Sequence, residues 1–225
     1  MEIEICCGSI QSAVNAKAAG ATRIELCQNL NEGGTTPSYA SIRQCVNDLH
    51  LDVYVLVRPR PGDFVYNELE IANMLEDIRI CKKLGVAGIV VGFLHKDGSI
   101  DTALTRRFVE AAAPVPVTFH RAFDRCADWR KSLEEVIACG CKRILTSGCQ
   151  PTAMEGKETL KELVSLAGDR ITILVGSGVR PDNVRELIDF TGAREVHGSC
   201  KVRTAGGYEE TDTETVKQLI QTLNS

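Results

Sequence analysis

Ile3-Glu4-Ile5-Cys6 and Arg23-Ile24-Glu25-Leu26-Cys27 are two segments in which apolar and polar side chains alternate. Such alternation is typical of a β-strand with one apolar face. A helical pattern over residues 9–19 lies between them, with Ser9 as a candidate N-cap and Gly20 as a candidate C-cap. The order strand, helix, strand predicts two parallel strands, because parallel neighbours need a crossover connection.

The same unit recurs along the rest of the chain. Glycines close the helical patterns and precede short apolar runs at Gly20, Gly85, Gly140, Gly168 and Gly192. We expect strands to begin near Ile3, Arg23, Val53, Gly88, Val115, Arg143, Ile171 and Arg194. We expect helices over residues 9–19, 38–48, 67–84, 102–112, 128–139, 154–167, 181–191 and 212–223.

This alternation decides between two parallel architectures. Sharing 225 residues among eight units leaves about 28 for each, close to the minimum for a strand, a crossover helix and two short loops. No phosphate-fingerprint turn follows the first strand, so an open doubly wound sheet fits less well. The sequence therefore predicts one domain over residues 1–225, a (β/α)8 barrel of the TIM type with functional residues at the C-terminal ends of its strands.

Composition excludes several classes of partner. The 26 basic and 30 acidic residues give a net charge of −4 and form no block of one sign, so neither nucleic acid nor an anionic membrane is an expected partner. The apolar run from Ile89 to Leu94 is too short to cross a bilayer, and the acidic start at residues 1–5 is unlike a secretory signal. We expect a cytoplasmic protein whose ten cysteines are mostly reduced core residues.

Strand alternation also predicts which side chains enter the barrel. The outer strand faces must be apolar to meet the helices, so polar residues of the opposite parity should point inward. These are Glu4, Cys6, Glu25, Cys27, Thr118, His120, Glu195, His197 and Ser199. Buried carboxylates need partners or a ligand. Arg58, at the end of the third strand, is the expected counter-ion, and a purely structural Glu/Arg network is the alternative.

Cys6 and Cys27 occupy matching positions on adjacent predicted strands. Two thiolates without a certain third ligand suit Cu(I) better than tetrahedral Zn²⁺. Two small buried thiols that pack as apolar residues are the alternative.

A second candidate site lies in the loops after strands six, seven and eight. Gly176, Ser177 and Gly178 precede a helix that we expect to start at Pro181, so their amides could bind an anion. Ser147 and Gly148 flank them on one side, and His197 and Ser199 on the other. Phosphate-binding barrels hold their phosphate at this end. The pattern predicts a phosphorylated or carboxylated ligand with Arg58 as clamp, and ordinary glycine turns are the alternative.

Candidate acid/base residues stand at the same barrel end. His120 ends the fifth strand, and Asp124 is close enough in sequence to orient its ring, as a general base requires. Glu25 is the other candidate proton carrier. A hydrogen-bonded core histidine is the alternative for His120.

Taken together, these segments resemble the CutC family. The resemblance extends from Ile3 to about Lys201 and rests on residues 23–27, 32–38, 58–60, 62–64, 117–124 and 145–148. It implies a cytoplasmic barrel, often dimeric, with a role in copper homeostasis and with Cys6 and Cys27 as the Cu(I) ligands.

Two hypotheses for the function follow. The first is a Cu(I)-binding protein that buffers or delivers copper without a chemical step. The second is a barrel enzyme that acts on a small phosphorylated or carboxylated metabolite. The convergence of an arginine, a histidine and an aspartate on one mouth favours the enzyme, whereas the family resemblance favours copper.

Overall fold

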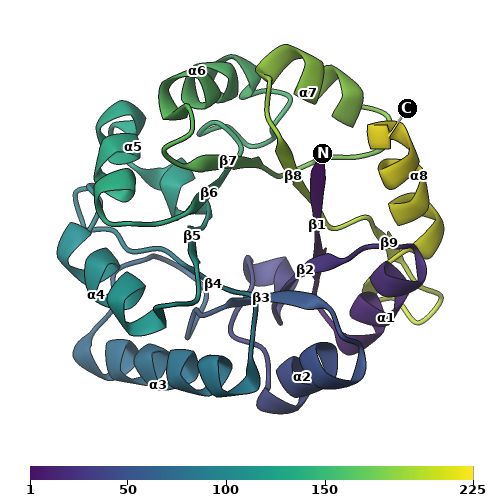
Figure 1. Cartoon of the computed structure of the whole chain (residues 1–225), viewed down its shortest axis with the longest axis horizontal. Coiled ribbons are helices and arrows are strands. Elements are labelled where there is room, and N and C mark those ends of the chain that lie inside the picture. The colour runs from purple at the N-terminus through teal and green to yellow at the C-terminus, as the bar shows by residue number, and fades with distance from the viewer. Residues whose placement is uncertain (225) are drawn as a thin grey trace.

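The structure is a computed structural model that describes residues 1–224. Within this range eight parallel strands hydrogen-bond in sequence order and close into a barrel, which confirms the predicted fold. The helices form a ring around it (Figure 1). The strands are β1 (Glu2–Cys7), β2 (Arg23–Leu26), β3 (Asp52–Leu56), β4 (Gly88–Val91), β5 (Val117–Phe119), β6 (Arg143–Thr146), β7 (Thr172–Val175) and β8 (Glu195–Gly198).

The surrounding helices begin and end close to the predicted residues. They are α1 (Ile10–Ala18), α2 (Tyr39–Arg43), α3 (Glu68–Leu84), α4 (Thr102–Ala112), α5 (Trp129–Ala138), α6 (Lys157–Ala167), α7 (Val184–Thr191) and α8 (Thr213–Asn224). After α2 the chain continues as a π-helical turn, η2 (Gln44–Asp48). Ser9 caps α1 as predicted, because its side chain accepts a hydrogen bond from the Ser12 amide.

Helix α7 starts later than the sequence predicts. We expected its first turn at Pro181, but the regular helix begins at Val184. The Asn183 side chain accepts a hydrogen bond from the Arg180 amide and donates one to the Gly178 carbonyl. These bonds stabilise a turn over residues 180–183, and a turn of this kind competes with helical hydrogen bonding.

The side chains of each strand point alternately outward to the helices and inward to the interior of the barrel. Ile5, Ile24 and Val55 belong to the apolar core between the strands and the helices. Inside the barrel, Tyr54 lies against Gly88, where a Cβ atom would come within 1.8 Å of the tyrosine ring. Glycine at position 88 therefore gives the ring the space it occupies.

Several short elements lie outside the predicted pattern. Residues 201–211 form an antiparallel hairpin of β9 (Lys201–Arg203) and β10 (Glu209–Thr211), and two 3-10 helices, η1 (Leu30–Glu32) and η3 (Arg121–Arg125), follow β2 and β5. The hairpin packs on α1 through hydrogen bonds between Thr211 and the side chains of Ser12 and Asn15. No helix in residues 1–224 has both the length and the apolar composition needed to span a membrane.

Candidate functional site

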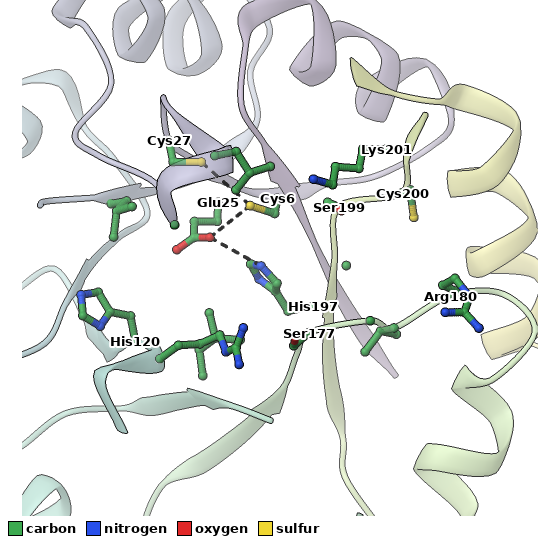
Figure 2. Close-up of a pocket in the computed structure, with 18 of the residues that line it drawn as sticks. Cys6, Glu25, Cys27, His120, Ser177, Arg180, His197, Ser199, Cys200 and Lys201 are labelled. Atoms are coloured by element: carbon green, nitrogen blue, oxygen red, sulfur yellow. Dashed lines mark hydrogen bonds and ion pairs between the residues drawn. The ribbon is translucent and has the colours of Figure 1, made fainter. Parts of the chain in front are cut away.

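A cavity of about 500 Å³ opens at the C-terminal ends of the strands. It is mixed in character, with thiols, a carboxyl group, two imidazoles and several apolar side chains in its wall (Figure 2). The residues that line it include Cys6, Glu25, Cys27, Arg58, Phe64, His120, Ser177, His197 and Ser199. This is the end at which the barrel prediction places function.

Strand register brings four polar residues together on one side of the barrel. Cys6 on β1 is the direct neighbour of Glu25 on β2, and Glu4 on β1 is the neighbour of His197 on β8. Cys6 Sγ lies 3.4 Å from Glu25 Oε2, and His197 Nε2 lies 3.5 Å from the same oxygen. Figure 2 shows these contacts as a continuous chain on one wall of the cavity.

The predicted thiol pair is present at the upper end of this chain. Cys6 Sγ and Cys27 Sγ are 4.0 Å apart, and both residues are buried free cysteines. The hydrogen bond to Cys27 and burial raise the pKa of the Cys6 thiol well above its usual range. Without a metal, Cys6 is therefore a neutral thiol at physiological pH.

Glu4 and His197 form a charged pair beneath the cavity. His197 Nδ1 lies 3.0 Å from Glu4 Oε1. Burial alone would raise the pKa of Glu4, but the hydrogen bond with His197 and the nearby cations lower it. Burial alone would lower the pKa of His197, but Glu4 and Glu25 raise it. Glu25 has fewer compensating contacts, and burial raises its pKa.

The counter-ions of the buried carboxylates are Arg23 and Arg143. The Arg23 guanidinium lies 3.3 Å from Glu4 and 2.5 Å from Glu195, and Arg143 lies 3.1 Å from Glu4 and 3.4 Å from Glu195. Neither arginine was predicted from the sequence as an inward-facing residue, although Arg23 has the same strand parity as Glu25. Both are the first residues of their strands, β2 and β6, and strand alternation at these positions indicates an inward side chain.

Arg58 is buried as predicted, but it is not the counter-ion of these glutamates. Its two terminal nitrogens donate to the carbonyl oxygens of Glu32, Gly34 and Gly62, so it joins the loops after β2 and β3. Its Nε is buried and has no hydrogen-bond partner within residues 1–224. The expected counter-ion role is wrong because carbonyls of these loops lie closer to the guanidinium than the carboxylates do.

His120 lies at the end of β5, where the sequence predicts it. Its ring occupies the space beside Gly92, where a Cβ atom would come within 2.4 Å of the imidazole, and it packs 5.0 Å from the Phe64 ring. Nδ1 accepts a hydrogen bond from the Ala122 amide, so the neutral ring carries its proton on Nε2. Burial and the charge of Arg58 lower the pKa of His120 to about 3.

His120 Nε2 is consequently a buried N–H donor with no acceptor in the described part of the chain. Buried donors without partners are rare, because each one has lost its hydrogen bonds to water. His120 lines the cavity, so an acceptor atom of a ligand could restore the missing bond.

Asp124 does not orient His120, and this part of the prediction is wrong. Its carboxylate accepts hydrogen bonds from Arg121, Thr146, Ser147 and the Cys149 amide. It therefore stabilises the junction between the loops after β5 and β6. The η3 turn directs Asp124 towards β6 and away from the His120 ring.

The predicted anion-binding residues separate into two groups. Ser177, Gly178, His197 and Ser199 line the cavity together with Arg58. Ser147 and Gly148 do not line it: Ser147 is hydrogen-bonded to Asp124, and a Cβ atom at Gly148 would come within 2.4 Å of the Gly156 carbonyl. Gly176 lies against Leu145. In the described part of the chain, the amides of Gly178 and Val179 donate no internal hydrogen bond, and both residues line the cavity.

Comparison with known proteins places the chain among CutC proteins. The model of the CutC family matches residues 1–202. A family protein CutC of Parabacteroides distasonis is 51% identical over 200 residues, which cover 88% of this chain and 82% of that protein. A family protein CutC of Xanthomonas campestris pv. campestris is 41% identical with complete coverage of both chains.

A solved structure agrees with these sequence matches. The crystal structure of a CutC protein from Streptococcus agalactiae, whose name assigns it provisionally to copper homeostasis, has a TM-score of 0.84 and 36% identity to this chain. The match covers 88% of this chain and 98% of that one.

Proposed function

The chain belongs to the CutC family, and from this premise we propose that it takes part in copper homeostasis by binding Cu(I) between Cys6 and Cys27. The observation that carries the proposal is the 4.0 Å separation of the two sulfurs at the cavity wall. An ion bound to two thiolates at roughly 2.3 Å each needs sulfurs at most about 4.6 Å apart, so the pair fits with little movement. Thiolates are also the donors that Cu(I) prefers.

An anaerobic Cu(I) titration against a competing chelator tests this proposal. We expect one tight site that Cys6→Ser or Cys27→Ser each removes, because a two-thiolate site requires both sulfurs. Cys139→Ser is the matched control, since Cys139 is equally buried but its thiol contacts the Thr102 carbonyl. Equal Cu(I) affinity in all three variants would mean that the pair is only part of the core.

A second candidate function is the binding and conversion of a small phosphorylated or carboxylated metabolite. Two buried donors, His120 Nε2 and Arg58 Nε, have no partner among residues 1–224 and belong to residues that line the cavity. The amides of Gly178 and Val179, which donate no hydrogen bond within the described residues, lie in the loop after β7 at the same mouth. Oxygen acceptors of an anionic ligand would satisfy such donors.

Thermal denaturation with inorganic phosphate and a panel of phosphorylated and carboxylated metabolites tests the second candidate. A ligand that binds only the folded state at 100 times its Kd stabilises by about 2.7 kcal/mol. We expect His120→Phe to reduce this shift and His95→Gln, an exposed change, to leave it intact. The absence of any shift across the panel would count against a metabolite site.

We further propose a cytoplasmic location and a homodimer. The ten free cysteines support a reducing compartment, because disulfides form readily in oxidising ones. The homodimer follows from the family resemblance, and light scattering on the purified protein at several concentrations tests it.

A further inference from the structure

We infer that Cys6, Glu25 and His197 form a three-donor site for a divalent transition metal, with Zn²⁺ as the best-fitting ion. The site shares Cys6 with the proposed copper pair but otherwise uses different donors, so it does not rest on Cu(I) binding.

The spacing of the donor atoms matches a tetrahedral ion. Cys6 Sγ and Glu25 Oε2 are 3.4 Å apart, and His197 Nε2 and Glu25 Oε2 are 3.5 Å apart. One donor atom of each residue lies within 4.8 Å of the other two. Tetrahedral Zn²⁺ with bonds of about 2.0 to 2.3 Å holds its ligand atoms roughly 3.3 to 3.8 Å apart. The three side chains therefore need only small rotations to bind one ion.

His197 is supported in the way that metal-binding histidines are. Its Nδ1 contacts Glu4 at 3.0 Å, which leaves Nε2 on the side of Cys6 and Glu25. Glu4 is itself fixed by Arg23 at 3.3 Å and Arg143 at 3.1 Å. A carboxylate behind the histidine fixes its ring orientation and makes it a better ligand.

The charge and chemistry of the donors favour a borderline divalent ion. A thiolate and a carboxylate balance the two positive charges, so the occupied site would be neutral in its buried position. Sulfur, nitrogen and oxygen donors together are typical of Zn²⁺, whereas Cu(I) favours thiolates. Within residues 1–224, Cys27 is not a member of the three-residue group, although its sulfur lies 4.0 Å from that of Cys6.

The fourth coordination position would face the cavity. Cys6, Glu25 and His197 all line it, and His120 and Arg58 line it as well with their unpartnered donors. Three protein ligands with one open position are typical of a catalytic zinc site, where water or a substrate oxygen completes the coordination. The ligand class that fits is a small molecule with a carbonyl or carboxylate oxygen, because the N–H groups of His120 and Arg58 can donate hydrogen bonds to such an oxygen.

Titration of the reduced, metal-free protein with Zn²⁺ against a chromophoric chelator tests the inference, with Co²⁺ absorption as a second readout. We expect one site and a thiolate-to-Co²⁺ charge-transfer band. Cys6→Ser, Glu25→Gln and His197→Gln should each weaken Zn²⁺ binding at least tenfold. Glu4→Gln, behind the histidine, should weaken it about 10- to 100-fold.

Cys27→Ser separates this site from the copper pair. It should abolish tight Cu(I) binding but leave Zn²⁺ affinity and the Co²⁺ band in place. His197→Gln should weaken Zn²⁺ binding and remove the Co²⁺ band but leave tight Cu(I) binding in place. Circular dichroism and the melting temperature of each variant identify any that fail to fold. If a variant fails to fold, Zn²⁺ binding by Glu25→Gln, the isosteric change, decides whether the inference holds. Zn²⁺ binding that depends on Cys27 and not on Glu25, or no Zn²⁺ binding at all, would overturn the inference.

Discussion

Among single residues, His120 is a histidine whose pKa burial and the charge of Arg58 lower to about 3. It is buried between Phe64 and the glycine at position 92, with its proton on Nε2. The sequence predicted its location but not this environment, because strand parity gives the direction of a side chain and not its partners. Arg58 and Asp124 illustrate the same limit: Arg58 is buried and Asp124 is half-buried, and loop carbonyls and β6 provide their partners.

His120 should make the stability of the protein depend on pH. Its folded pKa of about 3 lies below the unfolded value of 6.5, so the unfolded chain binds the extra proton between these values. Above pH 6.5 the free energy of unfolding does not depend on the titration of His120. Below pH 6.5 it falls with decreasing pH by up to about 1.4 kcal/mol per pH unit because of this group. When urea denaturation is measured between pH 5 and 7.5, the free energy of unfolding should depend less steeply on pH for His120→Asn than for the unmodified protein.

The matched control for this measurement is His95→Gln. His95 is exposed, with 55% of its side chain accessible, and it should keep the slope of the unmodified protein. If His120→Asn and His95→Gln change the slope equally, His120 is not held neutral by the fold.

At the scale of elements, the alternation of strands and helices was predictable because it depends on local signals. Glycine C-caps and serine N-caps are visible in the sequence, and the strands and helices begin within a few residues of the predicted positions. The β9–β10 hairpin was not predictable in this way. All three residues of β9 are exposed, so this strand buries no apolar face that a sequence pattern would indicate. The hairpin is held instead through Thr211 of β10, which is hydrogen-bonded to the side chains of Ser12 and Asn15 on α1.

The packing of β3 against β4 gives a prediction at this scale. Gly88→Ala would place a methyl group 1.8 Å from the Tyr54 ring, and the ring lies against Arg143 at 3.7 Å. Overpacking of this kind costs about 1 to 3 kcal/mol. We expect the free energy of unfolding of Gly88→Ala, measured in urea, to fall by at least about 1 kcal/mol.

Gly8→Ala is the control for this change. Its added Cβ would meet Leu30 at 3.5 Å, an ordinary van der Waals distance, so the loss of stability should be small. Similar losses for the two alanine variants would contradict the packing argument and would indicate that glycine is not required at position 88 for steric reasons.

At the scale of the whole molecule, the interior of the barrel is tied together by charge. Arg143 from β6 reaches Glu4 on β1 and Glu195 on β8, so a single guanidinium connects three strands that are not all neighbours in the closed sheet. Glu4 in turn positions His197 at the floor of the cavity. The stability of the barrel and the geometry of the candidate metal site therefore depend on the same buried network.

Removing Arg143 should consequently destabilise the fold and disturb the site at once. Only 6% of its side chain is exposed, and Arg143→Met would leave Glu4 and Glu195 with one guanidinium, that of Arg23, between them. Breaking a buried ion pair costs about 3 to 5 kcal/mol. Arg170→Met removes an even closer pair, at 2.6 Å from Glu134, but 49% of the Arg170 side chain is exposed, and surface pairs contribute about 0 to 1 kcal/mol. Urea denaturation of both variants should therefore separate them by at least 2 kcal/mol, and equal losses would mean that the network is not what holds the barrel closed.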